Sequence, residues 1–397
     1  MNVMRKIVSI LLLFATLCGV DIASAQEDAK RGFNLIVVGD PQPQTKAQME
    51  SLEREIIPQI GDIVEEYRAE SELPIAILLT GDVVWDTMAF LPRVKRVFES
   101  LGVPVYAVIG NHDHNRKHCR TQRRAEQEFE EIFGVRNQMF MLGETLFLTF
   151  DNIEYRRNKT YGEGIDAEQL VWMSEVLEGM PKDMRIVACM HALATKRTPQ
   201  GNSVKPYAKP IVAMAGEREL HFITGHHHNH GTYDLAPNVI EHNVAQVSGN
   251  LWFAPICSDG TPRGVFCIEE RDGEWQWHHR LLGKSADEVL IAWQEGVVKD
   301  NEEHVVVKVI GWDSAWSVEW EEDGEARGAM EQISILDPDY LYYVDNEAQY
   351  KKKFMYRLRK SAHPHSHYFR LRRTNPDSEV RIVATDRFGR EYTTTVK

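Results

Sequence analysis

Five apolar, β-prone segments of the chain each end in polar residues that can bind a metal ion, and this recurrence leaves few folds open to the chain. The segment at residues 221–223 leads into Gly225-His226-His227-His228. The other four lead into Gly39-Asp40-Pro41-Gln42, Gly81-Asp82, Gly110-Asn111-His112-Asp113 and His191. In α/β sheets, ligands bind outside the carboxyl ends of the strands, so we expect the five blocks to converge on one edge.

The side chains in these blocks indicate a metal centre. A lone Asp after a strand is usually a turn former or a helix cap, and a His-rich tract can bind metal adventitiously. These explanations would have to hold independently at five strand ends. Oxygen and imidazole donors without a thiolate suit Mn, Fe or Zn.

The spacing of the blocks suits two metal ions bridged by a carboxylate, which is the arrangement that two-metal phosphoryl hydrolysis requires. Asp82 follows a central segment and can offer one oxygen to each ion, so we expect it to be the bridge. Two residues are expected to complete the first ion's ligands, Asp40 and His228. Three are expected to hold the second ion, Asn111, His191 and His226.

His112 is the candidate general acid. It follows Asn111 directly, which places an imidazole on the leaving-group side, and the neighbouring Asp113 is expected to orient it.

Taken together, the blocks resemble those of the calcineurin-like metallophosphoesterase superfamily, over roughly residues 33–283. The resemblance implies a dinuclear phosphomonoesterase or phosphodiesterase in which a metal-bound hydroxide attacks the ester. Wider features are similar to an exported bacterial branch that carries a C-terminal β domain, which residues 285–397 resemble. They are the stretch from Gly81 to Asp86, Asp151-Asn152, and the stretch from Pro255 to Pro262.

Gln42 departs from the family pattern, which usually has His at this position. A carboxamide oxygen is neutral and a weaker ligand than imidazole, so the first site is expected to bind metal less tightly and to favour Mn over Zn. The expected cofactors are two divalent ions, with Mn or Fe favoured and Zn possible. The alternative is a degenerate one-metal module that binds a phosphorylated ligand without turnover, and the presence of His112 argues against it.

The composition limits the location and the partners. Arg5 and Lys6 precede an apolar run that ends near Ala23-Ser24-Ala25, so residues 1–25 are expected to be a cleaved signal peptide, and a lipoprotein attached through Cys18 is less favoured. Cleavage changes the formal net charge from −13 to −14. We therefore expect an exported, periplasmic or secreted protein with no nucleic-acid surface and no membrane span.

The hydrophobic pattern predicts an α/β fold, a four-layer αββα sandwich with mixed sheets over residues 33–283, and then a small all-β domain over 285–397. Helices are predicted at 45–67, with a bend at Pro58, and at 90–101, 125–133 and 166–180. Paired strands are predicted at 138–151 and 264–282. Five later strands are predicted, at 305–310, 316–321, 368–372, 380–386 and 392–396.

Further residues are candidates for the pocket. Arginine or lysine side chains in loops could clamp a phosphate, namely Arg116, Arg156, Arg157, Lys196, Arg197 and Arg263. His227 or His230 is expected to line the pocket. A disulfide between Cys257 and Cys267 is possible.

The substrate is expected to be a phosphorylated small molecule, glycan or lipid, and monoester and diester hydrolysis both stay open. The C-terminal domain could dock a glycan or a protein. The sequence does not determine the oligomeric state.

Overall fold

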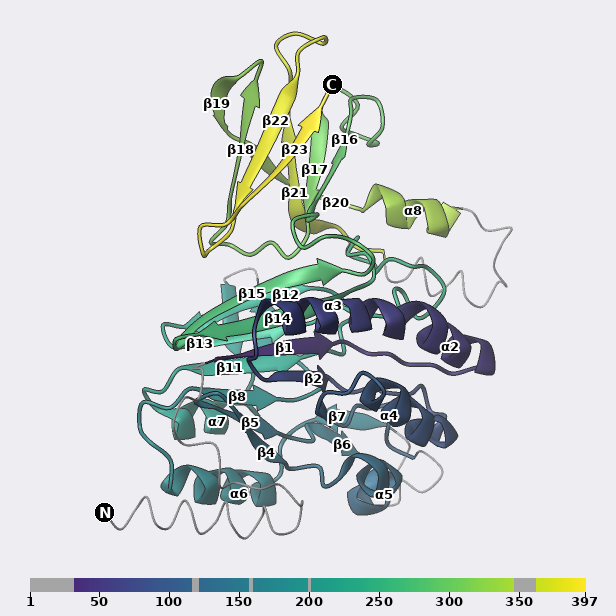
Figure 1. Ribbon diagram of the computed structural model, residues 1–397, viewed down its shortest axis with the longest axis vertical. Helices are drawn as coiled ribbons and strands as arrows, with labels where there is room; N and C mark the ends of the chain where they lie inside the picture. Colours follow the sequence, from purple (N-terminus) through teal and green to yellow (C-terminus); the bar gives the residue numbers. More distant parts are fainter. Residues whose placement is uncertain (1–31, 116–120, 157–159, 199–200, 346–361) are drawn as a thin grey trace.

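The computed structural model describes residues 32–115, 121–156, 160–198, 201–345 and 362–397. The predicted signal peptide at residues 1–25 lies outside the described residues, as do Arg116, Cys119 and Arg157. The chain forms a two-sheet sandwich with helices on both outer sides, followed by a C-terminal region of antiparallel strands (Figure 1). This is the predicted α/β arrangement of mixed sheets followed by a β region.

The first sheet has five strands in the order β15-β14-β1-β2-β3. Their bounds are β15 Glu274–Leu281, β14 Gly264–Arg271, β1 Gly32–Val38, β2 Ile75–Leu79 and β3 Val105–Ala107. The pairs β1–β2 and β2–β3 are parallel, and the pairs β1–β14 and β14–β15 are antiparallel.

The second sheet has six strands in the order β12-β13-β11-β8-β5-β4. Their bounds are β12 Gly231–Ala236, β13 Val239–Asn243, β11 Leu220–Thr224, β8 Ile186–Cys189, β5 Thr145–Thr149 and β4 Met139–Leu142. The central strands β13, β11, β8 and β5 run parallel, and the two edge strands are antiparallel to their neighbours.

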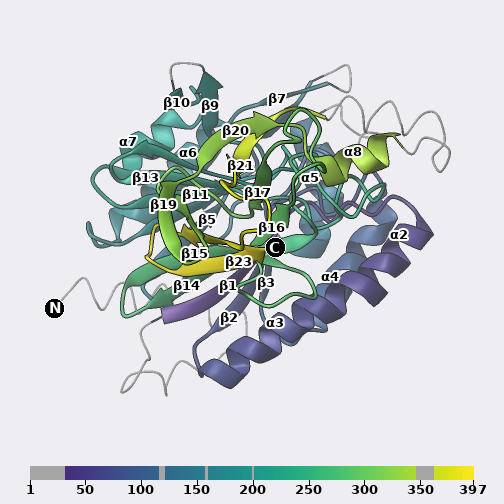
Figure 2. The same cartoon turned by 90° about the horizontal axis from the view of Figure 1, so that it is seen from above.

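Helices cover the outer faces of both sheets, as Figure 2 shows from above. The first sheet is covered by α2 Lys46–Ser51, α3 Ile57–Glu70, α4 Leu91–Glu99 and α5 Gln122–Phe133. The second is covered by α6 Ala167–Glu178 and α7 Lys209–Ala215. Two short ribbons complete this part, β6 Ile153–Tyr155 with β7 Tyr161–Glu163, and β9 Thr195–Thr198 with β10 Gly201–Val204.

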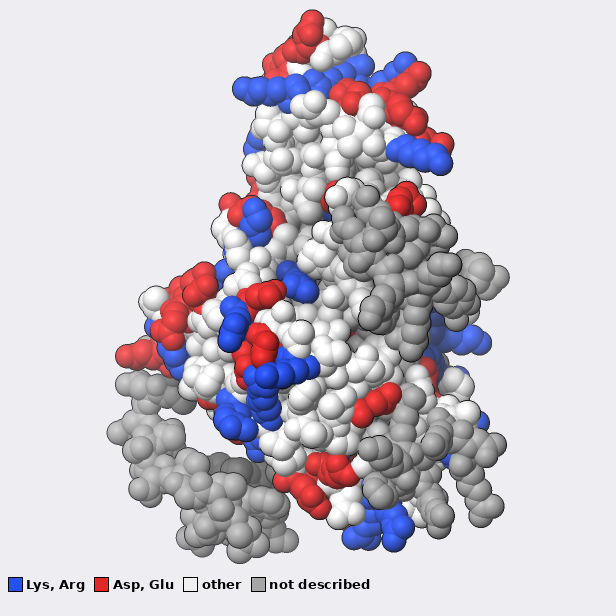
Figure 3. Space-filling model, turned by 90° about the vertical axis from the view of Figure 1, so that its right-hand side faces the viewer, with Lys and Arg blue, Asp and Glu red and all other residues white. Residues whose placement is uncertain are grey.

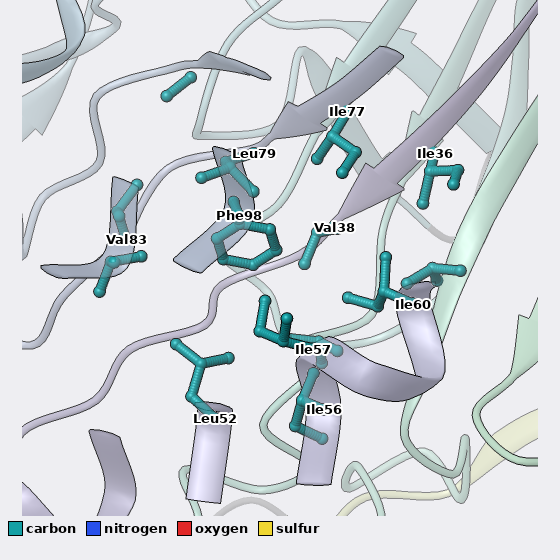
Figure 4. Packing of buried hydrophobic residues seen from close by; sticks show 14 of the residues in the cluster. Ile36, Val38, Leu52, Ile56, Ile57, Ile60, Ile77, Leu79, Val83 and Phe98 are labelled. Carbon is teal, nitrogen blue, oxygen red and sulfur yellow. The ribbon is translucent and has the colours of Figure 1, made fainter. Parts of the chain in front are cut away.

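Alternation along β1 explains the layers. Successive side chains of a strand point to opposite faces, and here both faces are buried. Ile36 and Val38 pack with Phe98 and the helices of the outer layer (Figure 4). Leu35 and Val37 pack between the two sheets. The apolar run before Asp40 is therefore a central strand. The helices of the outer layer pack on one of its faces, and the second sheet packs on the other.

The helix predicted at 45–67 is one continuous helical segment with an irregularity. Residues 52–56 form a π-helical stretch between α2 and α3, directly before Pro58, which occupies the first turn of α3. Proline is tolerated there because the first-turn N–H groups have no intrahelical partner. A short 3₁₀ turn, Met88–Phe90, similarly precedes α4.

The C-terminal region is a sandwich of two four-stranded antiparallel sheets. One contains β16 Leu290–Trp293, β17 Val305–Val309, β21 His365–Leu371 and β20 Glu331–Ile335. The other contains β19 Glu325–Ala329, β18 Ser317–Glu322, β22 Val380–Thr385 and β23 Glu391–Val396. The helix α8 Pro338–Asp345 was not predicted.

The structure also bears on the predictions about the disulfide and about membrane-spanning helices. Cys257 and Cys267 are buried free thiols, so the possible disulfide is not formed. Among the described residues, no helix is long and apolar enough to cross a membrane.

Figure 3 shows one face of the molecule, on which acidic and basic side chains are interspersed.

Candidate metal centre

The strand-end residues adopt a left-handed backbone conformation that residues other than glycine rarely adopt. Five of them have positive φ angles, namely Asp40 (37°), Gln42 (47°), Asp82 (47°), His226 (65°) and His228 (60°). Such backbone strain costs of the order of 1–3 kcal/mol per residue and concentrates at functional sites. The left-handed turns direct polar side chains from neighbouring strand ends toward a common point.

Glycines beside these residues permit the close approach. A Cβ atom at Gly110 would lie 2.4 Å from Oδ1 of Asp82, and one at Gly225 would lie 2.7 Å from Oδ1 of Asp40. Real Cβ atoms essentially never come so close, so the glycines that precede Asn111 and His226 are packing requirements of the site.

The carboxylate of Asp82 faces two different groups of side chains. Its Oδ2 accepts a hydrogen bond from Nε2 of Gln42 at 2.9 Å. Its Oδ1 lies 3.4 Å from Nε2 of His191. One carboxylate thus presents one oxygen to each group, which is the geometry that a bridging ligand requires.

The first group contains Asp40, Gln42 and His228. Nε2 of His228 lies 3.3 Å from Oδ2 of Asp40 and 3.0 Å from Nε2 of Gln42. A half-turn of the Gln42 carboxamide exchanges its nitrogen and oxygen, which would present Oε1 to the same position. Both Asp40 and Gln42 are buried.

The second group contains Asn111, His191 and His226. Nε2 of His191 lies 3.1 Å from Oδ1 of Asn111 and 3.1 Å from Nδ1 of His226. Nδ1 of His191 faces the carbonyl oxygen of Thr80 at 2.9 Å. A backbone carbonyl in this position keeps the proton on Nδ1, which leaves Nε2 to bind a metal. Ligand atoms of Asp82, His191 and His226 all lie within 4.8 Å of one another.

The site fits divalent cations. Oδ1 of Asp40 and Oε1 of Gln42 are buried and have no hydrogen-bond partner among the described residues. Burial raises the pKa of Asp40 well above its usual range, and it lowers the pKa of His228 to about 3. Buried carboxylate oxygens beside neutral imidazoles are unfavourable alone, and a cation would compensate for their desolvation.

His112 lies at the edge of this cluster. Its backbone N–H donates to Oδ1 of Asp82 at 2.7 Å. Its ring stacks on Trp85, with ring centroids 4.1 Å apart, and its Nδ1 lies 3.0 Å from Oδ1 of Asp86. Nε2 is the ring atom left to face a substrate.

The orienting role predicted for Asp113 is wrong in this structure, because Asp86 contacts the His112 ring instead. Asp113 is buried and accepts three backbone hydrogen bonds, from Val83, Val84 and Gly110. It therefore holds two strand-end loops together. Burial, and then the charge of Asp82, raises the pKa of Asp113 to about 7.

A buried ion-pair group supports the same loop and was not predicted. Nδ1 of His114 lies 2.7 Å from the carbonyl oxygen of Gly110, and its Nε2 lies 2.9 Å from Oδ2 of Asp151. The hydroxyl of Tyr155 donates to the carbonyl oxygen of Asn111. Asp151 follows a strand as the ligand blocks do, and Asp151-Asn152 was part of the family resemblance, but neither signal indicated the pairing with His114.

The residues that were predicted to clamp a phosphate lie in different parts of the structure. Arg197 and His230 line one cavity, whereas Lys196 lines a different one. Arg263 packs over the Trp252 ring and bonds to the Ser248 carbonyl. The side chain of His227 is exposed.

Comparison with known proteins identifies two matching family models. The family model for calcineurin-like phosphoesterases matches residues 33–230, and the model for the C terminal of calcineurin-like phosphoesterase matches residues 241–392. No curated protein matches the chain.

Several solved structures match this chain over part of its length. A dimetal phosphatase from Danio rerio is 13% identical with a TM-score of 0.43, and the match covers 65% of this chain and 98% of that chain. A purple acid phosphatase from yellow lupin is 10% identical with a TM-score of 0.39, over 70% and 51%. A 5'-nucleotidase precursor from Thermus thermophilus is 11% identical with a TM-score of 0.38, over 63% and 54%.

Proposed function

Because the chain belongs to the calcineurin-like phosphoesterase family and is thus a metal-dependent phosphoric ester hydrolase, we propose that its reaction takes place at the two groups joined by Asp82. The observation that carries the proposal is the division of the Asp82 oxygens between Gln42 and His191. The first ion would be held by Asp40, Gln42, Asp82 and His228. The second would be held by Asp82, Asn111, His191 and His226.

Bound cations would neutralise the charge that builds up on the phosphoryl group and activate the attacking water. The protein's own contribution is positioning. Strained strand-end turns fix Asp40 and His228, and the Thr80 carbonyl fixes the His191 ring. Such preorganisation avoids the cost of reorienting dipoles during the reaction.

His112 donates the proton to the leaving oxygen in this proposal. Trp85 and Asp86 hold its ring, and Asp86 keeps the proton on Nδ1 while Nε2 exchanges a proton with the substrate. Asp86 and Trp85 are therefore positioning residues.

We also propose that the protein is exported and acts on a phosphorylated small molecule, glycan or lipid. The apolar run between Lys6 and Ala25 supports export. The experiment is expression of the full chain in a bacterial host, followed by N-terminal sequencing of the mature protein. A mature chain that begins at Gln26 outside the cytoplasm supports export, and an intact cytoplasmic chain contradicts it.

Turnover separates the monoester and diester alternatives. The purified protein is loaded with Mn, Fe or Zn and assayed with p-nitrophenyl phosphate and bis-p-nitrophenyl phosphate. Asp82→Asn is the informative variant, since it weakens the bridge between both groups. We expect turnover of one ester to exceed that of the other and to be lost in Asp82→Asn. Undiminished turnover in that variant would contradict the assignment.

A further inference from the structure

A cavity of about 500 Å³ lies between the metallophosphoesterase sandwich and the C-terminal region. One wall comes from the sandwich and includes Arg197, His230 and Tyr233. The other comes from the C-terminal region and includes His365 and His367. We call this the interface cavity. Its volume is within the range of sites that bind small organic molecules.

The two histidines of β21 each present one ring nitrogen that lacks a hydrogen-bond partner among the described residues. His365 and His367 are two positions apart on a strand, so both side chains point to the same face, and their ring centroids are 6.0 Å apart. Nε2 of each ring is buried and has no hydrogen-bond partner among the described residues. Buried polar atoms normally find a partner, so this pair indicates a ligand position.

The hydrogen-bond donors of the cavity wall suit an anion. Its two carboxylates, Asp234 and Asp313, are already bonded to Arg387, at 3.2 and 2.8 Å. Among the described residues, no carboxylate forms an ion pair with Arg197. Asp259, whose charge acts on both imidazoles, already accepts hydrogen bonds from Thr261 and from the backbone N–H of His230. No carboxylate of the described residues accepts a hydrogen bond from the guanidinium of Arg197 or from Nε2 of either imidazole.

The interface cavity and the candidate metal centre share the loop that follows β11. His230 lies two residues after the candidate ligand His228, so their Cα atoms are at most about 7.6 Å apart. Arg197 also lies near both walls, because it lines the cavity together with Tyr233 and His365. A substrate with its phosphate at the metals could extend its leaving group into this space.

We propose that the interface cavity binds an anionic group, a carboxylate or a second phosphate, on the leaving group of the substrate. This inference rests on the proposed function, since it places the ester phosphate at the metal centre. Arg197, His365 and His367 donate hydrogen bonds to the anion. The C-terminal region thereby supplies part of the substrate-binding site.

Matched esters test the proposal. The ratio of kcat/KM for 4-carboxyphenyl phosphate to that for phenyl phosphate is measured, and 4-phosphonophenyl phosphate distinguishes a phosphate site from a carboxylate site. We expect one of the anionic esters to be preferred by about tenfold or more, the effect of one charge-assisted hydrogen bond. Arg197→Gln, His365→Asn and His367→Asn should each remove most of this preference.

Two variants serve as controls. His304→Asn and Arg372→Gln change the same residue types in the C-terminal region but do not line the interface cavity, and they should keep the ratio of the unmodified protein. Thermal unfolding confirms that each variant is folded. An active protein with a ratio near one, or with a ratio that all three cavity variants leave unchanged, would overturn the proposal.

Absence of turnover with every ester and metal would instead overturn the proposed function. Anion binding in the interface cavity is then tested separately. The protein is titrated with benzoate and with phenylphosphonate, and the histidine side-chain signals are followed by NMR. Shifts of the His365 and His367 signals without a shift of His304 would support an anion site. No shift at His365 or His367 with either anion would overturn it.

Discussion

At the scale of single residues, we expect Gln42 to set the strength of the proposed first metal site. Its carboxamide lies between the Asp82 carboxylate and the His228 imidazole, where a stronger ligand would be compatible with the geometry. A neutral amide in this position reduces the number of strong donors around the first ion. The two ions should therefore differ in affinity.

We predict that Gln42→His tightens metal binding at the weaker site by roughly tenfold or more, the scale on which changes around a metal alter its affinity. Competition with a chelator measures the two affinities. Gln44→His is the matched control, because Gln44 is exposed two residues further along the chain. Equal affinities in all three proteins would show that Gln42 is not a ligand.

His112 supports a second prediction at this scale. A general acid contributes about 10²- to 10⁴-fold, so His112→Ala should lower kcat by that order. The loss should be greater for phenyl phosphate than for p-nitrophenyl phosphate, whose leaving group needs less protonation. Asp86→Asn should show the same trend with a smaller loss. A loss of equal size for both esters, at unchanged metal content, would argue for a purely structural His112.

At the scale of elements, helix caps and strand ends determine where the side chains are placed. Helix α6 begins after Asp166, whose Oδ1 accepts a hydrogen bond from the backbone N–H of Gln169 at 3.0 Å. The same carboxylate lies 2.7 Å from Nη2 of Arg136. The cap therefore connects α6 to the segment that follows α5.

Asp166→Ala should lower the free energy of unfolding by about 0.5–2 kcal/mol, the usual cost of losing an N-cap. Urea denaturation measures the change. Glu175→Ala, at an exposed position of the same helix, should change stability by less than about 0.5 kcal/mol. Equal effects of the two substitutions would contradict the role of the cap.

The elements also show what the sequence could reveal. The spacing of the apolar residues was sufficient to predict α6 and the hairpin of β14 and β15, because each has a regular apolar pattern and a clear turn or cap. The edge strand β19 was missed because its exposed side chains show no apolar alternation, and β20 because Ile333 and Ile335 are its only apolar residues. The strand-end blocks predicted which side chains meet, because parallel strands bring their carboxyl ends together.

Contacts between distant segments could not be read from the sequence. The pairing of His112 with Asp86 depends on how two loops 26 residues apart fold over Trp85. The interface cavity brings together Arg197 and His365, which belong to different parts of the chain. No local pattern encodes such a meeting, because packing in three dimensions decides it.

At the scale of the whole molecule, specific contacts join the C-terminal region to the sandwich. The hydroxyl of Tyr368 donates to the carbonyl oxygen of Asp259 at 2.9 Å, and Nη2 of Arg390 donates to that of Trp277 at 2.7 Å. The Trp277 and Phe388 rings pack edge to face, with centroids 4.7 Å apart. The two parts are therefore expected to unfold together.

A buried ion pair near this junction gives a stability prediction. Nζ of Lys308 lies 2.8 Å from Oδ2 of Asp337, and both side chains are fully buried. Lys308→Met would leave the Asp337 charge unpaired and should cost about 3–5 kcal/mol. Arg381→Ala removes the more exposed pair with Glu321 and should cost no more than about 1 kcal/mol. Calorimetry of both variants tests this, and similar melting temperatures would contradict it.

Metal content measured together with turnover tests the central claim most directly. The mature protein is loaded with Mn, Fe or Zn, its metal is quantified by elemental analysis, and hydrolysis of p-nitrophenyl phosphate and bis-p-nitrophenyl phosphate is followed on the same sample. The structure predicts about two ions per chain and turnover that is lost with the metal, as expected for a two-metal site. One ion or none, without turnover under any metal, would contradict the dinuclear phosphoesterase.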